Sequence, residues 1–216
     1  MNLVSTLIFI VTFVGCAVAI VASALALVIR RFQAAWMIGR VMLVWVGLYA
    51  AALLFVSFTS SPVILDLGQE HCFDEMCFSV KGVTTTQTLG TTPHQITAHG
   101  LYYVLAVQLH NAAKRVPQRP DSAMMWITDQ QGHVYTDWVN AQETPGQPMG
   151  GPITIRQIWY RRLEPGESMT HSVAFDLPVN VVQPRLVIKE GSGPTPLIIG
   201  DENSFFHAKT AFRLTP

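Results

Sequence analysis

Two long apolar stretches open the chain, and a short basic segment separates them. Neither residues 1–29 nor residues 41–65 contain a charged side chain, whereas the segment between them carries three arginines. Each stretch exceeds the roughly 20 apolar residues that a helix needs to cross the hydrocarbon core of a membrane. The pattern predicts two transmembrane helices, at about residues 3–29 and 41–59, joined by a turn over residues 30–40.

The three arginines, Arg30, Arg31 and Arg40, predict how these helices are oriented. No basic residue precedes the first apolar stretch, so the positive-inside rule places the connecting turn in the cytoplasm. Both ends of the chain then face outward. We expect a protein of the bacterial cytoplasmic (inner) membrane whose N-terminus and C-terminal part are extracytoplasmic, with the lipid bilayer as one partner.

Two alternatives for the first apolar stretch fit the sequence less well. A cleaved signal peptide needs a basic beginning, and residues 1–5 contain no basic side chain. Lipid attachment at Cys16 needs a short apolar segment, whereas the apolar run continues to Ile29. Small residues on both stretches, such as Gly15 and Gly47, predict instead that the two helices pack closely as an antiparallel hairpin.

Beyond the second apolar stretch, the chain changes to short alternating segments separated by proline and glycine. In "GLYYVLAVQLHNAA", Leu105, Val107 and Leu109 share one face, which is the period-two pattern of a strand with one buried side. No comparable helical pattern competes with it. The sequence therefore predicts an all-β domain over residues 66–216, after a transmembrane hairpin over residues 1–65.

Turn signals divide this region into short strands. "MMWITDQQGHVYTDW" predicts two strands around a turn at residues 129–132. Pro165 and Gly166 suit the centre of a type II turn, because proline presets the first dihedral angle and glycine tolerates the positive second one. The strand after them ends at Pro178, and "PRLVIKE", "PLIIGD" and "KTAFRL" predict further strands. Strands this short and regularly spaced predict an antiparallel, immunoglobulin-like β-sandwich.

The order of these motifs resembles bacterial telokin-like, immunoglobulin-like extracytoplasmic domains of unknown function. In that family a strand ending in an Asn-containing turn, here "YYVLAVQLHN", precedes a "D-x-x-G-x-x-Y" hairpin and an "L-x-P-G-E" turn, here "DQQGHVY" and "LEPGE". The resemblance spans about residues 77–214. It implies a β-sandwich without catalytic residues. Members are typically lipoproteins or single-span exported proteins, so the predicted two-span anchor departs from the family.

Charge and motifs argue against several function classes. The chain has 14 basic and 14 acidic side chains, so it lacks the basic surplus of a nucleic-acid-binding protein. It contains no G-x-S-x-G nucleophile motif, no phosphate-binding loop and no dinucleotide fingerprint. We therefore expect a protein-interaction or assembly module, not an enzyme, that binds an unknown envelope protein or membrane complex without a cofactor. The long polar loop over residues 137–152 is the candidate contact surface.

Cys72 and Cys77, in "QEHCFDEMCFSV", are the clearest chemical feature of the chain. On one continuous strand they would lie too far apart to bond and would point to opposite faces. If Phe73–Met76 form a four-residue hairpin loop, the two cysteines face each other at a distance that a disulfide spans. The predicted outward location permits oxidation, so we expect a disulfide.

The same segment also supports a metal hypothesis. His71, Cys72, Met76 and Cys77 offer soft or borderline ligands suited to Cu(I), so a copper-binding or electron-transfer module is the alternative function. Two spans before an outward β-sandwich resemble subunit II of the haem–copper oxidases. Here, however, four residues instead of three separate the cysteines, and the pair stands at the start of the domain.

A weaker candidate site is the acidic segment "GDENS". Asp201, Glu202 and Asn203 offer oxygen ligands for calcium. They lack the spaced ligands of an EF-hand loop, so a solvated acidic turn competes with the calcium site.

Overall fold

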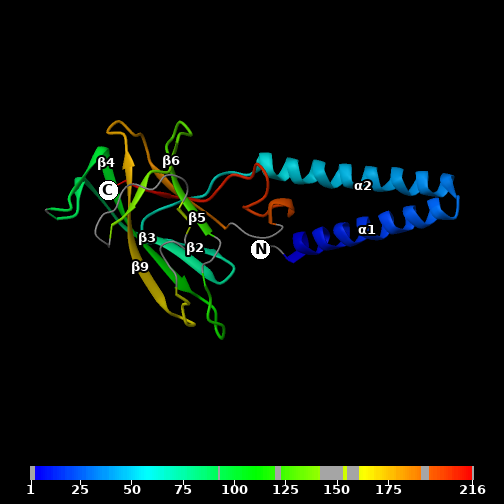
Figure 1. Ribbon diagram of the computed structural model, residues 1–216, viewed down its shortest axis with the longest axis horizontal. Helices are drawn as coiled ribbons and strands as arrows, with labels where there is room; N and C mark the ends of the chain where they lie inside the picture. The colour runs from blue at the N-terminus through cyan, green and yellow to red at the C-terminus, as the bar shows by residue number, and fades with distance from the viewer. Residues whose placement is uncertain are drawn as a thin grey trace. The chain divides into compact units, whose positions relative to one another are not determined.

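The structure is a computed structural model that describes residues 3–91, 93–119, 123–141, 153–154, 161–190 and 195–215. The chain forms two compact units, shown in Figure 1. The first unit comprises Met1–Ser61 and Gly193–Ala208, and the second comprises Pro62–Ser192 and Lys209–Pro216. No pattern in the sequence predicts that a segment from the C-terminal part belongs with the helices.

Two antiparallel helices dominate the first unit, α1 (Leu3–Val28) and α2 (Phe32–Thr59). The expected turn over residues 30–40 is shorter than predicted, because α2 already begins at Phe32 and only residues 29–31 connect the helices. An uncharged stretch predicts which part of a helix can lie in lipid. It does not predict the residue at which the helix begins or ends. A helix satisfies its own backbone hydrogen bonds, so α2 continues beyond the apolar stretch through Arg40.

The two helices contact each other as an antiparallel hairpin, as predicted, but Gly15 and Gly47 do not form the close contact. A side-chain carbon added at either glycine would meet no atom within 4 Å. Gly15 on α1, together with Met42 and Trp45 on α2, lines an apolar pocket of about 470 Å³. Small residues allow close approach only where the facing helix also presents small side chains, and here α2 presents bulky ones.

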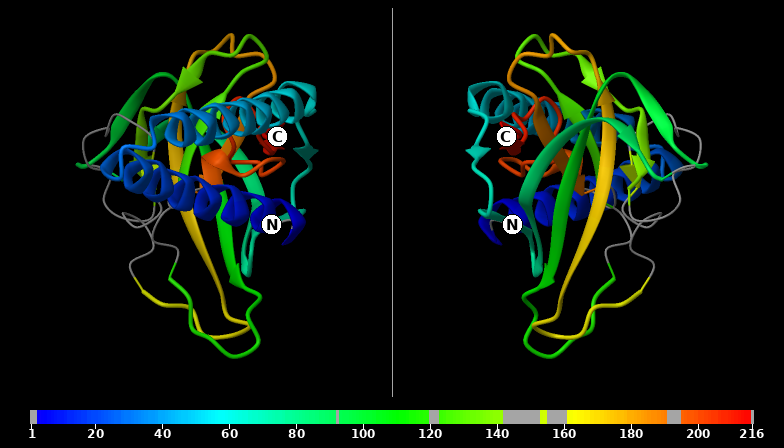
Figure 2. Two further views of the ribbon diagram at one scale, coloured as in Figure 1. Left: turned by 90° about the vertical axis from the view of Figure 1, so that its right-hand side faces the viewer. Right: turned by 90° about the vertical axis from the view of Figure 1, so that its left-hand side faces the viewer.

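The second unit is a sandwich of two β-sheets, as predicted, and Figure 2 shows it from two sides. The first sheet contains, in spatial order, β1 (Ile64–Leu65), β11 (Ala211–Arg213), β10 (Arg185–Glu190), β5 (Ala123–Thr128) and β6 (Val134–Tyr135), with β8 (Ile153–Thr154) also paired to β5. The second contains β2 (Glu70–Phe73), β3 (Met76–Leu89), β4 (Ile96–Asn111), β9 (Ser168–Leu177) and β7 (Trp138–Asn140).

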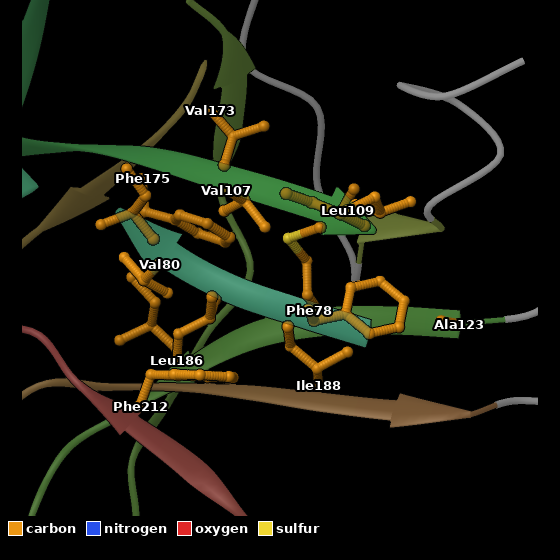
Figure 3. Packing of buried hydrophobic residues seen from close by; sticks show 14 of the residues in the cluster. Phe78, Val80, Val107, Leu109, Ala123, Val173, Phe175, Leu186, Ile188 and Phe212 are labelled. Carbon is orange, nitrogen blue, oxygen red and sulfur yellow. The ribbon is translucent and has the colours of Figure 1, made fainter. Parts of the chain in front are cut away.

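The core lies between the two sheets (Figure 3). Val107 and Leu109 of β4 point into it, which confirms the predicted alternation, and Leu186 and Phe212 contribute from β10 and β11. All four side chains are at most 1% exposed. Burial of apolar surface on facing sheets stabilises the sandwich by roughly 25 cal/mol for each Å² removed from water.

Two of the predicted turns form as the sequence indicates. The strands β5 and β6 pair across the turn that begins at Asp129. At the other turn, Gly166 has a φ of 77° and the Glu167 amide donates to the Glu164 carbonyl at 2.9 Å, as a type II turn requires. The asparagine of the Asn-containing turn, Asn111, is fully buried, and its side-chain amide donates to the Leu163 carbonyl at 2.9 Å.

The segment "PLIIGD" does not form the predicted strand. Residues Thr195–Leu197 form a single 3₁₀ turn, and further turns follow, with the Ile198 amide bonded to the Thr195 carbonyl and the Ser204 amide to the Asp201 carbonyl. Pro196 has no amide hydrogen to donate to a β-ladder. Apolar residues alone do not make a strand where no partner strand is available.

Candidate functional site

The hairpin of β2 and β3 holds a disulfide between Cys72 and Cys77. The two cysteines face each other across the strand pair, with their Cα atoms 3.9 Å apart. The turn is tighter than predicted, because Phe73 and Met76 also pair and only two residues connect the strands. Asp74 adopts a φ of 52°, a positive value of the kind that two-residue hairpin turns need.

The hairpin separates the four residues proposed as copper ligands. Successive side chains on a strand point to opposite faces, so His71 and Met76 lie on the face opposite Cys72 and Cys77. Met76 is buried in the sandwich core, and the ring of His71 packs edge-on against Phe73 with centroids 4.7 Å apart. In the disulfide the two sulfur atoms are bonded to each other, so neither is a thiolate ligand in this state.

A third side chain lies near the disulfide. The potential ligand atoms of Glu70, Cys72 and Cys77 are within 4.8 Å of one another, and this is the one such group among the described residues. Because two of its three members form the disulfide, a metal would compete with the cross-link for the same sulfur atoms. The arrangement favours the disulfide over the copper hypothesis.

The acidic segment near the C-terminus is a hydrogen-bonded turn. The Asp201 carboxylate accepts a hydrogen bond from the Asn203 amide at 2.8 Å, and the Asp201 carbonyl accepts one from the Ser204 amide at 2.9 Å. This is the pattern of an Asx turn, in which an aspartate fixes its own backbone. The geometry supports the turn and does not point to a calcium site.

Asp129 stands at the centre of the β5–β6 turn. It accepts hydrogen bonds from the His133 ring at 2.9 Å, the Tyr135 hydroxyl at 2.9 Å and the amides of Gln131 and His133. Burial raises the pKa of Asp129, but the hydrogen bonds to its charged form outweigh this effect and lower the pKa to about 2. The carboxylate stays ionised and stabilises the turn.

Asp176 of β9 plays a similar part at the beginning of β4. Its carboxylate accepts hydrogen bonds from the amides of His99 and Gly100 at 2.7 and 3.0 Å, and the His99 ring lies 3.1 Å away. At Gly100 an added side-chain carbon would lie 2.1 Å from the Leu177 carbonyl oxygen, so the two strands approach more closely than any other residue permits. Burial raises the pKa of the neighbouring Tyr102, and the charge of Asp176 adds to the effect.

Asp176 and His99 lie in the lining of an open pocket on the second unit. A cavity of about 500 Å³ is lined by residues from β4, β6 and β9 and from the chain that follows β6 and β9: His99, Gly100, Tyr135, Asp137, Asp176, Leu177, Pro178 and Val179. We call it the Asp176 groove. Sequence reasoning missed it, because its members are distant along the chain and no spacing marks them. The alternation of Asp176 with the core residue Phe175 is the one local signal that its side chain lies outside the core.

The predicted contact loop falls largely outside the described residues, since residues 142–152 are not among them. Its first part is a strand and not a loop. Trp138 and Val139 of β7 are 2% exposed and pair with β9, so they contribute packing and not a contact surface.

Comparison with known proteins places the chain in no family. No family model matches it, and no curated protein matches it. The resemblance to telokin-like domains therefore stays a prediction.

Several solved structures are similar to the chain at low identity. An uncharacterised β-sandwich protein from Clostridium difficile is 14% identical, with 72% of this chain and 96% of that one covered and a TM-score of 0.39. A secreted protein from Mycobacterium tuberculosis, MPT63, is 12% identical, with 73% and 100% covered and a TM-score of 0.38. The yjhA protein from Bacillus subtilis is 10% identical, with 70% and 99% covered and a TM-score of 0.38.

Proposed function

We propose that this protein is an envelope protein of the bacterial cytoplasmic membrane, in which two helices anchor a β-sandwich outside the membrane. The observation that carries the proposal is the exposure of apolar side chains along both helices. In the most apolar part of each helix only 6% and 11% of the residues are buried. At about 1.5 Å per residue, α1 and α2 are about 39 and 42 Å long, enough to cross a hydrocarbon core of about 30 Å.

The direction of crossing rests on charge and redox chemistry. The basic residues Arg30 and Arg31 lie in the connection between the helices, which favours a cytoplasmic turn. The disulfide between Cys72 and Cys77 persists in oxidising compartments and is reduced in most bacterial cytoplasms. Both features support the same orientation, with the sandwich outside.

The sandwich itself acts as an interaction or assembly module, without catalysis. Asp129 and Asp176, whose side chains are only 4% and 10% exposed, each use their oxygens in hydrogen bonds that fix the local backbone. General acid or base catalysis needs a carboxylate that is free to exchange a proton with a substrate. The Asp176 groove, with Val179 exposed at its edge, is the surface that we assign to a protein partner.

Site-specific photo-crosslinking in living cells tests the assignment. A photoreactive residue in place of Val179 probes the groove, and one in place of Val116 is the matched control, because Val116 is also exposed and apolar but follows the other end of β4. We expect a single protein adduct of defined mass from position 179 and none from position 116. Adducts from position 116 alone, or from neither position, would contradict the groove as the contact surface.

A further inference from the structure

A segment far along the chain returns to pack against helix α2 within the first unit. The Tyr49 hydroxyl donates a hydrogen bond to the Leu197 carbonyl at 2.6 Å, and the Ala208 amide donates one to the Ser60 hydroxyl at 2.8 Å. Figure 1 shows this segment in orange and red beside the last turns of α2. We call residues 195–206 the return segment.

The contacts show how far the return segment reaches along the helix. Tyr49 lies ten residues before the end of α2 at Thr59, which is about 15 Å along the helix axis. From Arg40 to Thr59 the helix rises about 29 Å, close to the thickness of the hydrocarbon core. If the core spans this part of α2, the Tyr49 hydroxyl and the Leu197 carbonyl that it binds lie within the outer half of the core.

Several backbone groups of the return segment are hydrogen-bonded within the protein. Within the segment the amides of Ile198, Asp201, Ser204 and Phe205 all donate to carbonyls of the same segment, at 2.9 to 3.2 Å. The Leu197 carbonyl accepts from Tyr49 of the helix, as described above. Irregular backbone is tolerated at membrane depth only where its polar groups are satisfied in this way.

The side chains of the return segment continue the apolar surface of α2. Phe206 stacks on Phe58, with ring centroids 5.4 Å apart, and both rings remain largely exposed, at 69% and 68%. Leu197 and Phe205 are also exposed, at 47% and 52%. In water, several large exposed apolar side chains on one short segment are unfavourable; in lipid they are the expected surface.

The acidic residues of the return segment lie near its shallow end. A side-chain carbon at Gly200 would be 3.7 Å from Val56, about one helical turn before Thr59. Asp201 and Glu202 follow Gly200 directly and are half-buried. They therefore lie near the level of the lipid headgroups, where charged groups cost far less than in the hydrocarbon core.

We propose that the return segment re-enters the outer leaflet of the membrane and contacts lipid as a third membrane element beside α1 and α2. The proposal rests on the membrane anchoring proposed above. In the sequence, β10 precedes the return segment and β11 follows it. The return segment would therefore attach the β-sandwich to the membrane a second time, in addition to the helices. The occupant of its apolar surface is the acyl-chain region of the outer leaflet.

Depth-dependent fluorescence quenching tests the proposal with the full-length chain. Single cysteines replace Leu197 or Phe206 in a Cys16→Ser background and are labelled with an environment-sensitive fluorophore. The protein is reconstituted in phosphatidylethanolamine–phosphatidylglycerol vesicles that contain phospholipids spin-labelled at a shallow or a deep position of the acyl chain. Phe55→Cys on α2 is the control for membrane insertion, and Val179→Cys on the second unit is the control for a water-exposed site.

We expect strong quenching at positions 197 and 206, with the deep quencher more effective at 197 and the shallow one at 206. Quenching at Phe55→Cys but at neither position of the return segment would overturn the proposal and leave the membrane anchor intact. No quenching at Phe55→Cys would instead show that the proposed anchoring itself is wrong.

A cross-link that holds the return segment on α2 shows whether a lack of quenching reflects detachment of the segment or a lack of lipid contact. The Ser57 and Ser204 hydroxyls lie 3.4 Å apart, so Ser57→Cys and Ser204→Cys together should form a disulfide under mild oxidation. Quenching should persist in the cross-linked protein. A cross-linked protein whose positions 197 and 206 are not quenched would contradict lipid contact even though the segment packs as described.

Discussion

Removing the disulfide should destabilise the second unit by only a modest amount. Cys72 and Cys77 are five residues apart in the sequence, so the cross-link closes a very short loop. In the chain-entropy model a loop of this length restricts the unfolded chain by about 2 kcal/mol. The β2–β3 pairing exists only in the folded chain, so it does not reduce this effect of the cross-link on the unfolded chain.

The double variant Cys72→Ala/Cys77→Ala measures this contribution in the full-length chain, with Cys16→Ser in every sample to exclude other thiols. Denaturant unfolding followed by tryptophan fluorescence reports on the second unit, because Trp138 is almost fully buried there. Cys77 is also buried, so its replacement removes packing as well as the bond. Comparing each protein with and without reductant isolates the bond, since reductant should lower the stability of the disulfide-containing protein alone.

Two results would refute the reasoning. A loss of more than about 5 kcal/mol on reduction would show that the disulfide holds the whole fold together and not only one hairpin. No loss at all would show that the cysteines are not bonded. Native mass spectrometry of the same sample, purified without chelator, should give a mass lighter by two hydrogens. An added copper that disappears in the double variant would support the copper hypothesis instead.

The same unfolding assay checks three further predictions. Gly100→Ala places a carbon 2.1 Å from the Leu177 carbonyl oxygen and should cost about 1–3 kcal/mol; an unchanged stability would contradict the close approach of β4 and β9. Leu105→Ala should cost about 2–5 kcal/mol, because Leu105 is fully buried, whereas Val179→Ala on the surface should change stability by less than about 0.5 kcal/mol. The pKa of Asp129 is lowered from 3.8 to about 2, so its ionised form stabilises the fold above about pH 4, and this stability is lost as the pH falls toward 2. In Asp129→Asn the stability should fall less between about pH 4 and pH 2 than in the unchanged protein. An equal fall in both proteins would contradict the hydrogen-bonded turn.

Features governed by short-range patterns could be predicted from the sequence. The absence of charge located both apolar helices, and the alternation around Leu105 located the central strand of the second sheet. The turn at Gly166 follows from the fixed dihedral angle of Pro165 and the conformational freedom of Gly166. The facing arrangement of Cys72 and Cys77 follows from the requirement that bonded cysteines lie opposite each other.

Features that depend on distant contacts could not be predicted. The apolar alternation around Ile198 looks like a strand, but whether a strand forms depends on a partner strand, and these residues pack on α2 instead. The Asp176 groove gathers side chains from β4, β6 and β9, which only the register of the second sheet and the β5–β6 hairpin bring together. The length of the connection between α1 and α2 depends on helix continuation outside the apolar stretch, which charge does not reveal.

The orientation of the protein in the membrane is open to one direct measurement, side-specific thiol labelling in spheroplasts. In a Cys16→Ser background, single cysteines replace Val116 on the second unit or Gln33 at the beginning of α2, both exposed. A membrane-impermeant maleimide should label Val116→Cys in intact spheroplasts and Gln33→Cys only after the membrane is permeabilised. Labelling of Gln33→Cys in intact spheroplasts, with Val116→Cys protected, would contradict an extracytoplasmic sandwich anchored by two helices.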